Sequence, residues 1–216
     1  MGENINMPDF DDLLAGRRSI RRYTTAAPPE TWLENMILSA TWAPSPRNSQ
    51  PVRFIRIESP EIKQRLQEAM INGWERLLDK AATCDHPKRL RNWINAYWRY
   101  SEFILRAPVL FAVGTVTPEG SFSSHLRQAG IINGNKRDDT DLDISVGLAL
   151  QGFILKGGEL GLGTCILTAP LSFIMDAGNI FGIKDIVIKC FVTAGFPDES
   201  PAAPKRTPVA DIYRRI

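Results

Sequence analysis

The alternation of apolar and polar positions along the chain predicts helices separated by short strands. Apolar side chains recur three and four residues apart over 28–43, 62–82 and 87–105, which is the spacing of helices with one buried face. A shorter segment of the same kind occupies 8–15 and ends at Gly16. Residues 141–160 are apolar nearly all round. We therefore expect this last helix to be buried, inside the domain or between subunits.

Apolar runs of strand length alternate with these helices. Residues 108–116 carry the pattern of a strand buried on both faces, and 54–57, 161–168 and 185–196 predict further strands. A short helix is predicted over 170–177. Residues 117–140 are rich in Gly, Ser, Asn and charge, and we interpret them as a long functional loop or mobile segment. This order of elements predicts an α+β or α/β domain in which helices cover a sheet. The aromatic residues between 93 and 103 are spaced as core residues.

Composition narrows the class of protein. A chain of 216 residues with 44% hydrophobic content can bury one core, so we expect a single domain over 1–216. The net charge of +2 does not indicate nucleic acid or an anionic membrane as a partner. The most apolar run, 142–155, is shorter than the roughly 20 residues that span a bilayer.

Cysteine usage and the N-terminus bear on the compartment. Cys84, Cys165 and Cys190 are an odd number without metal-ligand spacing, which indicates free thiols in a reducing compartment. Residues 1–12 are polar and acidic and lack the pattern of a signal peptide. We therefore expect a cytoplasmic protein.

Four arginines and a serine stand together in Arg17-Arg18-Ser19-Ile20-Arg21-Arg22-Tyr23. We call residues 17–23 the arginine segment. Guanidinium groups present planar forks of donors that suit a phosphate, and a nearby hydroxyl can complete such a site. The alternative is a solvated basic surface at the end of a helix, the more common role of such runs.

A second unusual stretch, Pro44-Ser45-Pro46-Arg47-Asn48-Ser49-Gln50-Pro51, follows the next helix. We call residues 44–51 the polar loop. Its three prolines stiffen the backbone, and its short polar side chains offer donors and acceptors at little entropic cost. The alternative is a simple connector between a helix and a strand.

No Ser-His-Asp set, carboxylate pair or Walker-type loop is present in the sequence, and Gly161-x-Gly163 is a weak dinucleotide signal because no strand precedes it. The residues alone indicate an α+β domain with an anion site built from separate segments.

Four motifs in order resemble the nitroreductase family. They are Arg-Arg-Ser-x-Arg-Arg-Tyr, Ala-Pro-Ser-x-x-Asn-Ser-Gln-Pro, Gly-Leu-Gly-Thr-Cys, and Gly-Phe-Pro followed by a proline-rich Lys-Arg tail. The resemblance implies an α+β three-layer fold with a central mixed, mainly antiparallel sheet flanked by helices. It also implies a helical excursion over about 60–107, a wrapping C-terminal tail over 197–216, and an intertwined homodimer with FMN at the subunit interface.

The resemblance implies the FMN contacts residue by residue. The phosphate, ribityl chain and pyrimidine edge would be held by Arg17, Arg18, Ser19 and Arg21, with Arg21 near the edge where negative charge collects on reduction. The polar loop would reach the same flavin from the other subunit through Pro44, Ser45, Pro46, Asn48 and Gln50. Leu167 and Thr168 match the segment beside the flavin N5, and Lys205 and Arg206 match a basic pair that closes on the phosphate. No acid, base or nucleophile of the protein is implied, and we interpret Cys165 as a packing residue.

The family implies an FMN-dependent oxidoreductase that transfers hydride by a ping-pong mechanism from NAD(P)H to a nitroaromatic, quinone or other conjugated small molecule. The sequence departs from many members after Gln50-Pro51, where Val52-Arg53 replaces Trp. Together with the Trp- and Arg-rich segment 73–106, the Val52-Arg53 sequence resembles the nitroreductase-type domain of deazaflavin-coenzyme biosynthesis. This resemblance implies an alternative function, the reduction of a larger anionic acceptor contacted by Arg53, Arg56 or Arg99. Two further alternatives for the function are a flavin-fragmenting benzimidazole synthase and a non-catalytic flavin-binding module.

Overall fold

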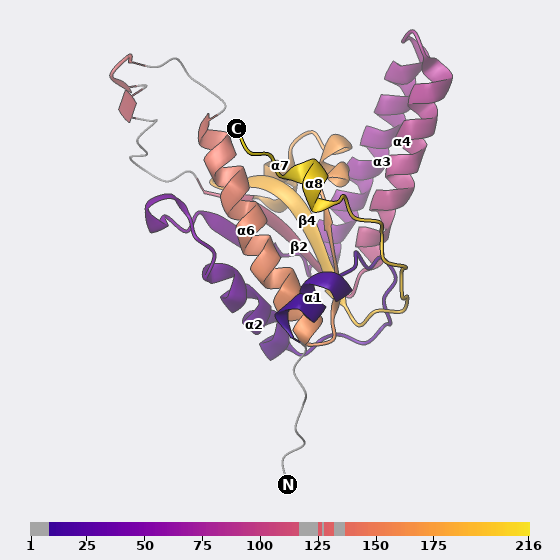
Figure 1. Ribbon diagram of the computed structural model, residues 1–216. Helices are drawn as coiled ribbons and strands as arrows, with labels where there is room; N and C mark the ends of the chain where they lie inside the picture. Colours follow the sequence, from indigo (N-terminus) through magenta and orange to yellow (C-terminus); the bar gives the residue numbers. More distant parts are fainter. Residues whose placement is uncertain (1–8, 117–124, 127, 132–136) are drawn as a thin grey trace.

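A computed structural model of the chain shows a four-stranded sheet between two helical layers (Figure 1). It describes residues 9–116, 125–126, 128–131 and 137–216. The principal helices and strands, in chain order, are α1 (Phe10–Gly16), α2 (Glu30–Thr41), β1 (Val52–Arg56), α3 (Pro60–Ala82), α4 (Pro87–Ser101), β2 (Val109–Thr115), α6 (Arg137–Glu159), β3 (Gly163–Leu167), α7 (Ala177–Phe181), β4 (Val187–Gly195) and α8 (Val209–Ile212). Short 3-10 helices are η1 (Pro46–Asn48), η2 (Glu102–Arg106) and η3 (Ala169–Ser172).

The strands are ordered β1-β2-β4-β3, and each neighbouring pair is antiparallel. All seven residues of the inner strand β2 are buried, as its continuous apolar run predicts. A single parallel bridge, between Ser19 and Thr164, adds the arginine segment to the edge strand β3. The α+β class and the mainly antiparallel sheet expected from the sequence are confirmed.

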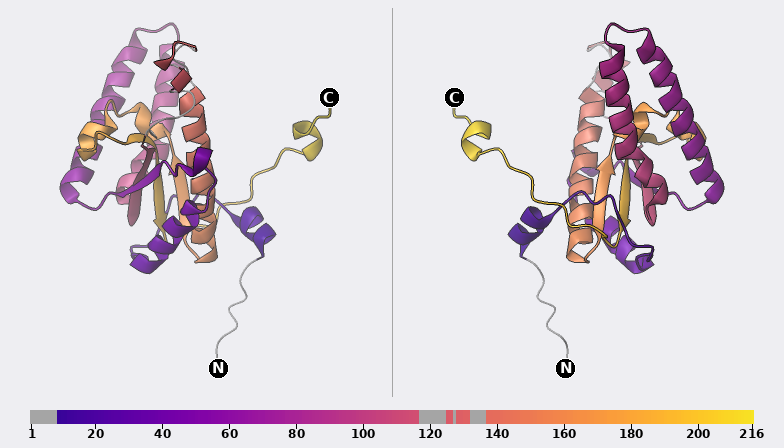
Figure 2. Two further views of the ribbon diagram at one scale, coloured as in Figure 1. Left: turned by 90° about the vertical axis from the view of Figure 1, so that its left-hand side faces the viewer. Right: turned by 90° about the vertical axis from the view of Figure 1, so that its right-hand side faces the viewer.

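Alternation along β2 divides the core into two halves. Val109, Phe111 and Val113 pack toward α2 and α6, while Leu110 and Ala112 pack toward α3 and α4. The sheet is therefore the middle of three layers. Figure 2 shows α3 and α4 extending beyond the sheet as a helical hairpin.

The aromatic residues of this hairpin take two roles. Trp98 stacks on Trp74, with ring centroids 5.5 Å apart, and meets Phe173 edge to face. Trp93, Tyr97 and Tyr100 are exposed on another side of α4. The expectation that these aromatics form core was therefore wrong for three of them, because periodicity alone does not distinguish two apolar faces of one helix.

Gly73 lets α3 approach the backbone of the segment before α7. A Cβ atom at Gly73 would lie 1.6 Å from the Phe173 carbonyl oxygen. We expect Gly73→Ala to lower the free energy of unfolding by about 1–3 kcal/mol, because helix and segment must separate. Urea denaturation measures this change. Gly158→Ala is the control, since a Cβ there would only touch a Leu13 methyl group at 3.9 Å; equal losses in both variants would contradict the packing argument.

Two boundaries differ from the sequence prediction. The segment 170–177 is not one helix, because η3 ends at Ser172 and α7 begins at Ala177. Helix α6 begins at Arg137, four residues before the predicted start, so the predicted loop is shorter. Most of the predicted loop 117–140 lies outside the described residues. Within the described part of the chain, no helix is long and apolar enough to cross a membrane.

Both ends of the described chain project from the body (Figure 2). No residue of α1 is buried, and every residue from Ala202 to Ile216 is exposed. The tail therefore does not wrap around its own subunit. Whether it wraps around a second one stays a prediction.

Candidate functional site

The arginine segment lies between β3 and the chain that leaves β4. The Ile20 amide donates to the Thr164 carbonyl at 2.9 Å, and the Thr24 amide donates to the Phe196 carbonyl at 3.0 Å. Ile20 fits against β3 because residue 163 is glycine; a Cβ atom there would lie 2.7 Å from the Ile20 side chain. Residues of β3 and of the chain after β4 thus fix the backbone of this segment, which argues against a simple solvated basic surface.

The nitrogen atoms of the Arg18 guanidinium differ in their hydrogen bonding. Its Nη1 donates to the carbonyls of Ala15 and Arg17 at 2.6 and 2.8 Å. Its Nε is buried and has no hydrogen-bond partner among the described residues. A buried charged donor without an acceptor is costly, so this atom fits a ligand oxygen.

Arg17 and Arg18 line a cleft of about 380 Å³. Its walls are α1, the end of α6, the beginning of β3 and residues 197–201, including Glu199. Ser19 is half-buried beside this cleft. Three of the four sequence motifs therefore meet at one end of the sheet.

Arg21 extends from the same segment toward α4. Its guanidinium carbon lies 5.9 Å from the centre of the Tyr100 ring, within the range of a cation–π contact. Tyr100 is 60% exposed, so this contact lies at the surface. The structure thus brings Tyr100 of α4 to the arginine segment.

Cys165 lies on β3 beneath the arginine segment. Burial raises the pKa of its thiol, and the positive charge of Arg21 only partly offsets this. The thiol is therefore protonated at neutral pH, in keeping with a packing role. Leu167, which is buried, and Thr168, which is exposed, follow on the same strand and at its end.

All three cysteines are free thiols, as expected. The described residues contain no cluster of His, Cys, Asp and Glu side chains that could hold a metal ion.

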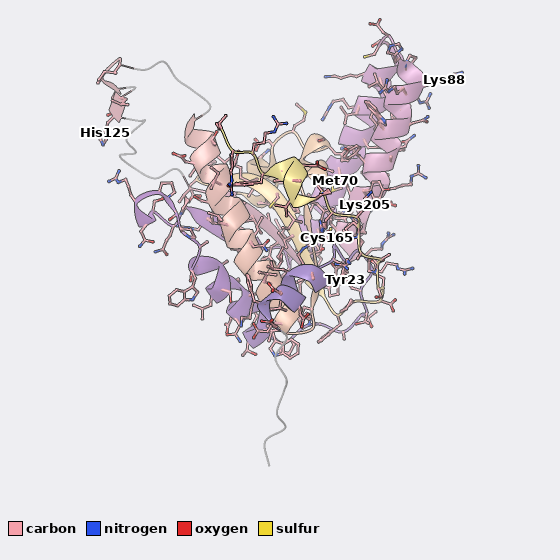
Figure 3. All side chains as sticks on the ribbon, viewed as in Figure 1. Tyr23, Met70, Lys88, His125, Cys165 and Lys205 are labelled. Atoms are coloured by element: carbon pink, nitrogen blue, oxygen red, sulfur yellow. The ribbon has the colours of Figure 1, made fainter. Side chains whose placement is uncertain are left out.

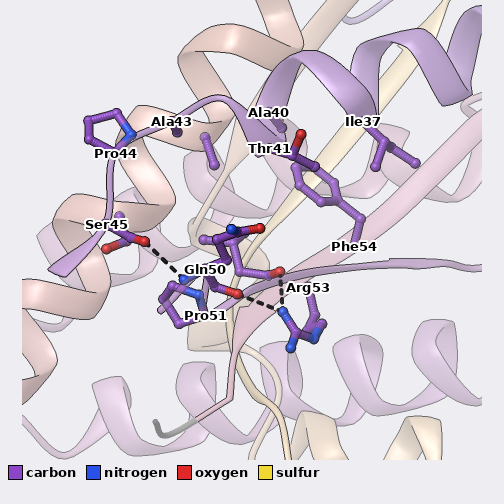
Figure 4. A pocket seen from close by; sticks show the side chains of 13 residues that line it. Ile37, Ala40, Thr41, Ala43, Pro44, Ser45, Gln50, Pro51, Arg53 and Phe54 are labelled. Atoms are coloured by element: carbon purple, nitrogen blue, oxygen red, sulfur yellow. Dashed lines mark hydrogen bonds between the residues drawn. The ribbon is translucent and has the colours of Figure 1, made fainter. Parts of the chain in front are cut away.

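The polar loop encloses a second pocket, of about 250 Å³, with α2, β1 and α6 (Figure 4). The backbone amide of Gln50 donates to Ser45 Oγ at 2.9 Å, and its side-chain Nε2 donates to Asn48 Oδ1 at 3.2 Å. Pro44, Ser45 and Gln50 line the pocket, whereas Pro46 and Asn48 belong to η1 beside it.

The backbone of the polar loop is unusual. Arg47, Asn48 and Gln50 have φ angles of 56°, 55° and 42°, a region that costs a residue with a side chain roughly 1–2 kcal/mol. Three such residues in one loop are a feature of functional sites more than of simple connectors. The sequence predicted the polar groups of this loop but not its conformation.

The arginine segment and the polar loop lie at opposite corners of the sheet. The segment joins β3 near Thr164, and this end of β3 pairs with Gly195 at the end of β4. The polar loop leads into Val52, which pairs with Thr115 and through it with Val187 at the beginning of β4. One subunit therefore does not bring the two groups of predicted site residues together.

Lys205 and Arg206 lie in the exposed tail, and they do not join the arginine segment of their own chain. Figure 3 labels Lys205 on this tail, and Figure 2 shows the tail leading away from the body. Their predicted phosphate contact stays untested.

The three arginines suggested for a large anionic acceptor differ in their surroundings. Arg56 forms salt bridges with Glu30 and, at 3.1 Å, with Glu58. Arg53 donates to the Gln50 and Val52 carbonyls at 2.8 and 2.9 Å. Arg99 is exposed on α4. Arg56 is thus neutralised by carboxylates, and Arg53 serves mainly to hold the polar loop.

Sequence reasoning missed Tyr23 and Glu199. The Tyr23 hydroxyl donates to the Ile20 carbonyl at 2.5 Å and lies 2.7 Å from Thr193 Oγ1. Burial raises its pKa well above the ordinary value. These partners are up to 170 residues apart in the chain, and no local pattern indicates such contacts.

We expect Tyr23→Phe to lower the free energy of unfolding by about 1–3 kcal/mol, because the buried Thr193 hydroxyl loses its partner. Thermal and urea denaturation measure the loss. Tyr97→Phe removes a hydroxyl from an exposed ring and is the matched control. A Tyr23 variant as stable as this control would show that the hydroxyl network does not hold the arginine segment.

The fold, the arginine segment and the polar loop define an α+β protein with two candidate binding regions at opposite corners of one subunit. The model of the Nitroreductase family matches residues 14–196, and the chain belongs to this family.

Similar proteins agree with this assignment. The chain is 27% identical to the Bacillus subtilis protein YfhC, named as an NAD(P)H nitroreductase, over 95% of this chain and 93% of that one. A BluB-like flavoprotein of Clostridium difficile superposes with a TM-score of 0.79 at 22% identity, covering 97% and 99% of the two chains. A nitroreductase structure from Desulfovibrio desulfuricans in complex with FMN gives a TM-score of 0.64 at 21% identity, covering 95% of each. The two structures show the same fold.

Proposed function

We propose that the protein is an FMN-dependent oxidoreductase that takes hydride from NAD(P)H and passes it to a nitroaromatic, quinone or other conjugated acceptor. Family membership supports the reaction class. The name of YfhC supports NAD(P)H as the donor, and the FMN complex of a similar structure supports the cofactor. The observation that carries the proposal is the fixed arginine segment, in which the buried Arg18 Nε has no hydrogen-bond partner in the part of the chain that the structure describes.

The chemistry of the donor set fits FMN. Its phosphate suits the guanidinium groups of Arg17 and Arg18 and the Ser19 hydroxyl, and an anionic oxygen would satisfy the buried Arg18 Nε. The polar loop adds amide and hydroxyl groups that suit a flavin ring edge.

Bound FMN would supply the two-electron chemistry through its ring. In this proposal Arg21 would hold a positive charge near the pyrimidine part of the bound flavin, and the backbone at Leu167 and Thr168 would help to hold its ring. Each residue would bind or orient the cofactor, and none would transfer a proton as an acid or base. The buried, protonated Cys165 thiol is consistent with this assignment.

The separation of the two groups leads us to propose a homodimer. If the polar loop of one subunit meets the arginine segment of another, both contribute to each FMN site. The outer surface of α6 supports this arrangement, because Ile144 and Leu148 are 54% and 42% exposed there. Leu38 on the neighbouring helix α2 and Trp42 directly after it expose further apolar side chains. Exposed apolar side chains on two helices that pack together are a feature of interfaces.

The projecting segments support the same proposal. α1 exposes Phe10 and Leu14, and the tail exposes Val209, Ile212 and Tyr213. These apolar groups bury little against their own subunit. We propose that they pack on the second subunit, where Lys205 and Arg206 would approach the FMN phosphate.

The visible spectrum of the purified protein tests the function. We expect a yellow protein that loses its colour when NADH or NADPH is added without oxygen, and regains it with an acceptor. Yellow protein that neither nucleotide reduces would favour a non-catalytic flavin-binding module. Accumulation of a benzimidazole under air would favour flavin fragmentation. Protein that takes up no FMN would contradict the proposal.

A further inference from the structure

Glu199 lies at the centre of the contacts that hold the arginine segment, although no part of the proposed hydride transfer uses it. One carboxylate oxygen, Oε1, accepts from the Arg21 amide at 2.5 Å and from the Arg22 amide at 3.1 Å. The other, Oε2, lies 3.4 Å from Arg22 Nε. One carboxylate thus contacts two consecutive amides and a guanidinium.

The position of Glu199 follows from the chain around it. The Tyr23–Pro197 bridge and the Asp198 amide, which donates to the Arg22 carbonyl at 2.9 Å, align the chain after β4 with the arginine segment. Without the carboxylate, the Arg21 and Arg22 amides would lose the hydrogen bonds that they make to the chain after β4. The Glu199 side chain is only 18% exposed, so water does not simply replace these bonds.

Glu199 also interacts differently with each arginine of the segment. It holds Arg22, whose side chain is otherwise 72% exposed, through its Nε. Arg21 donates its backbone amide to Glu199, while its guanidinium points away from this carboxylate and contacts the Ser19 carbonyl and the Tyr100 ring. Arg17 and Arg18 face the cleft that Glu199 also lines. The carboxylate therefore neutralises the one arginine that the proposed flavin site does not need.

We propose that Glu199 is a positioning residue for the arginine segment, whose carboxylate fixes the Arg21 and Arg22 amides so that Arg17, Arg18 and Arg21 are presented to FMN before it binds. This inference rests on the proposed function. A segment ordered in advance loses less conformational entropy on binding, so the contribution of Glu199 appears in FMN affinity.

The ionisation of Glu199 gives the proposal a pH dependence. The Arg21 amide is the main cause that lowers the pKa of Glu199, and the Arg22 amide and the charges of both arginines add to it. A carboxyl with a lowered pKa stabilises the folded segment above its unfolded-state pKa, and this stabilisation is lost as the pH falls through the folded-state value. The other ionisable groups that face it are Tyr23 and Cys165, with Asp12, Arg17 and Arg18 across the cleft. Burial raises the pKa of Tyr23 and of Cys165, so both groups stay protonated in acid and do not change charge in this range.

The test compares FMN affinity and amide exchange in four proteins: wild type, Glu199→Ala, Glu199→Gln and Asp198→Asn. Asp198→Asn removes the same charge one residue away and is the matched control, because this side chain is exposed and bonds to none of the described residues. We expect Glu199→Ala to raise the Kd for FMN by about 5- to 50-fold, since hydrogen bonds to a charged acceptor are lost. Glu199→Gln keeps a neutral oxygen that can accept from both amides, so we expect a smaller rise.

Two readouts separate positioning from general stability. Hydrogen exchange of the Arg21 and Arg22 amides in the FMN-free protein should accelerate in Glu199→Ala and not in Asp198→Asn. The Kd of wild type and of Asp198→Asn should rise between about pH 5 and pH 3, while that of Glu199→Gln rises less over this range.

Three outcomes would overturn the proposal. Wild-type protein that binds no FMN would overturn the proposed function and this proposal with it. Wild-type protein that binds FMN, with equal affinity in all four proteins, would overturn only the positioning role. Faster amide exchange in Glu199→Ala without a change in Kd would show that the order of the segment does not matter for binding.

Discussion

A Leu148→Arg variant is expected to sediment as a monomer and to lose FMN at the same time. Leu148 lies on the exposed apolar surface of α6, and a two-fold interface would contain the substitution twice. An unpaired charge buried in an interface costs roughly 3–5 kcal/mol, which corresponds to a rise of more than about 100-fold in the dimer dissociation constant. FMN is lost with the dimer because the arginine segment and the polar loop lie at opposite corners of one subunit.

Sedimentation velocity and the flavin content after gel filtration measure the two effects together. Met175→Arg places the same charge at an apolar residue that is 82% exposed in the loop before α7, and this control should stay dimeric and yellow. A Leu148 variant that remains a dimer would show that α6 is not the interface. A monomer that retains FMN would contradict the divided site.

Arg21→Ala should weaken FMN binding by about 10- to 100-fold, the range expected for a charge-assisted hydrogen bond. The folded protein should be almost unaffected, because the Arg21 side chain is exposed. Its contacts are a 3.4 Å bond to the Ser19 carbonyl and the cation–π contact with Tyr100. Flavin fluorescence titration gives the Kd, and thermal denaturation gives the stability.

Arg22→Ala is the matched control for this measurement. It removes the same charge from the next residue, whose guanidinium lies against Glu199 and whose amide is retained. We expect its Kd to stay within about 3-fold of wild type, in line with the small effect of an exposed ion pair. Arg21→Lys, which keeps the charge, should recover part of the affinity. If Arg21→Ala and Arg22→Ala weaken binding equally, the basic surface acts through its net charge and not through a specific contact.

Periodicity in the sequence predicted the long elements well. The apolar run of β2 and the apolar stripes of α2 and α3 matched the structure within a few residues. Each of these signals is local, since the residues that form the pattern also form the element. The four motifs identified the family for the same reason.

The sequence could not predict how distant residues meet. Tyr23 with Thr193, Glu199 with the Arg21 amide, and Arg21 with Tyr100 are contacts between elements, and nothing in either partner's surroundings specifies the other. The left-handed backbone at Arg47 and Asn48 was also missed, because positive φ is unusual for arginine and the loop has no glycine to indicate it. The site residues were therefore predicted by resemblance, and their geometry came from the structure.

The way the arginine segment is held also bears on when it becomes ordered during folding. Its partners Thr193 and Glu199 stand 170 residues after Tyr23 and 178 residues after Arg21 in the chain. Closing a loop of that length costs chain entropy before any contact is gained, so contacts this distant in sequence form late in folding. If the proposed flavin site is correct, the folded protein and not an early folding intermediate takes up FMN.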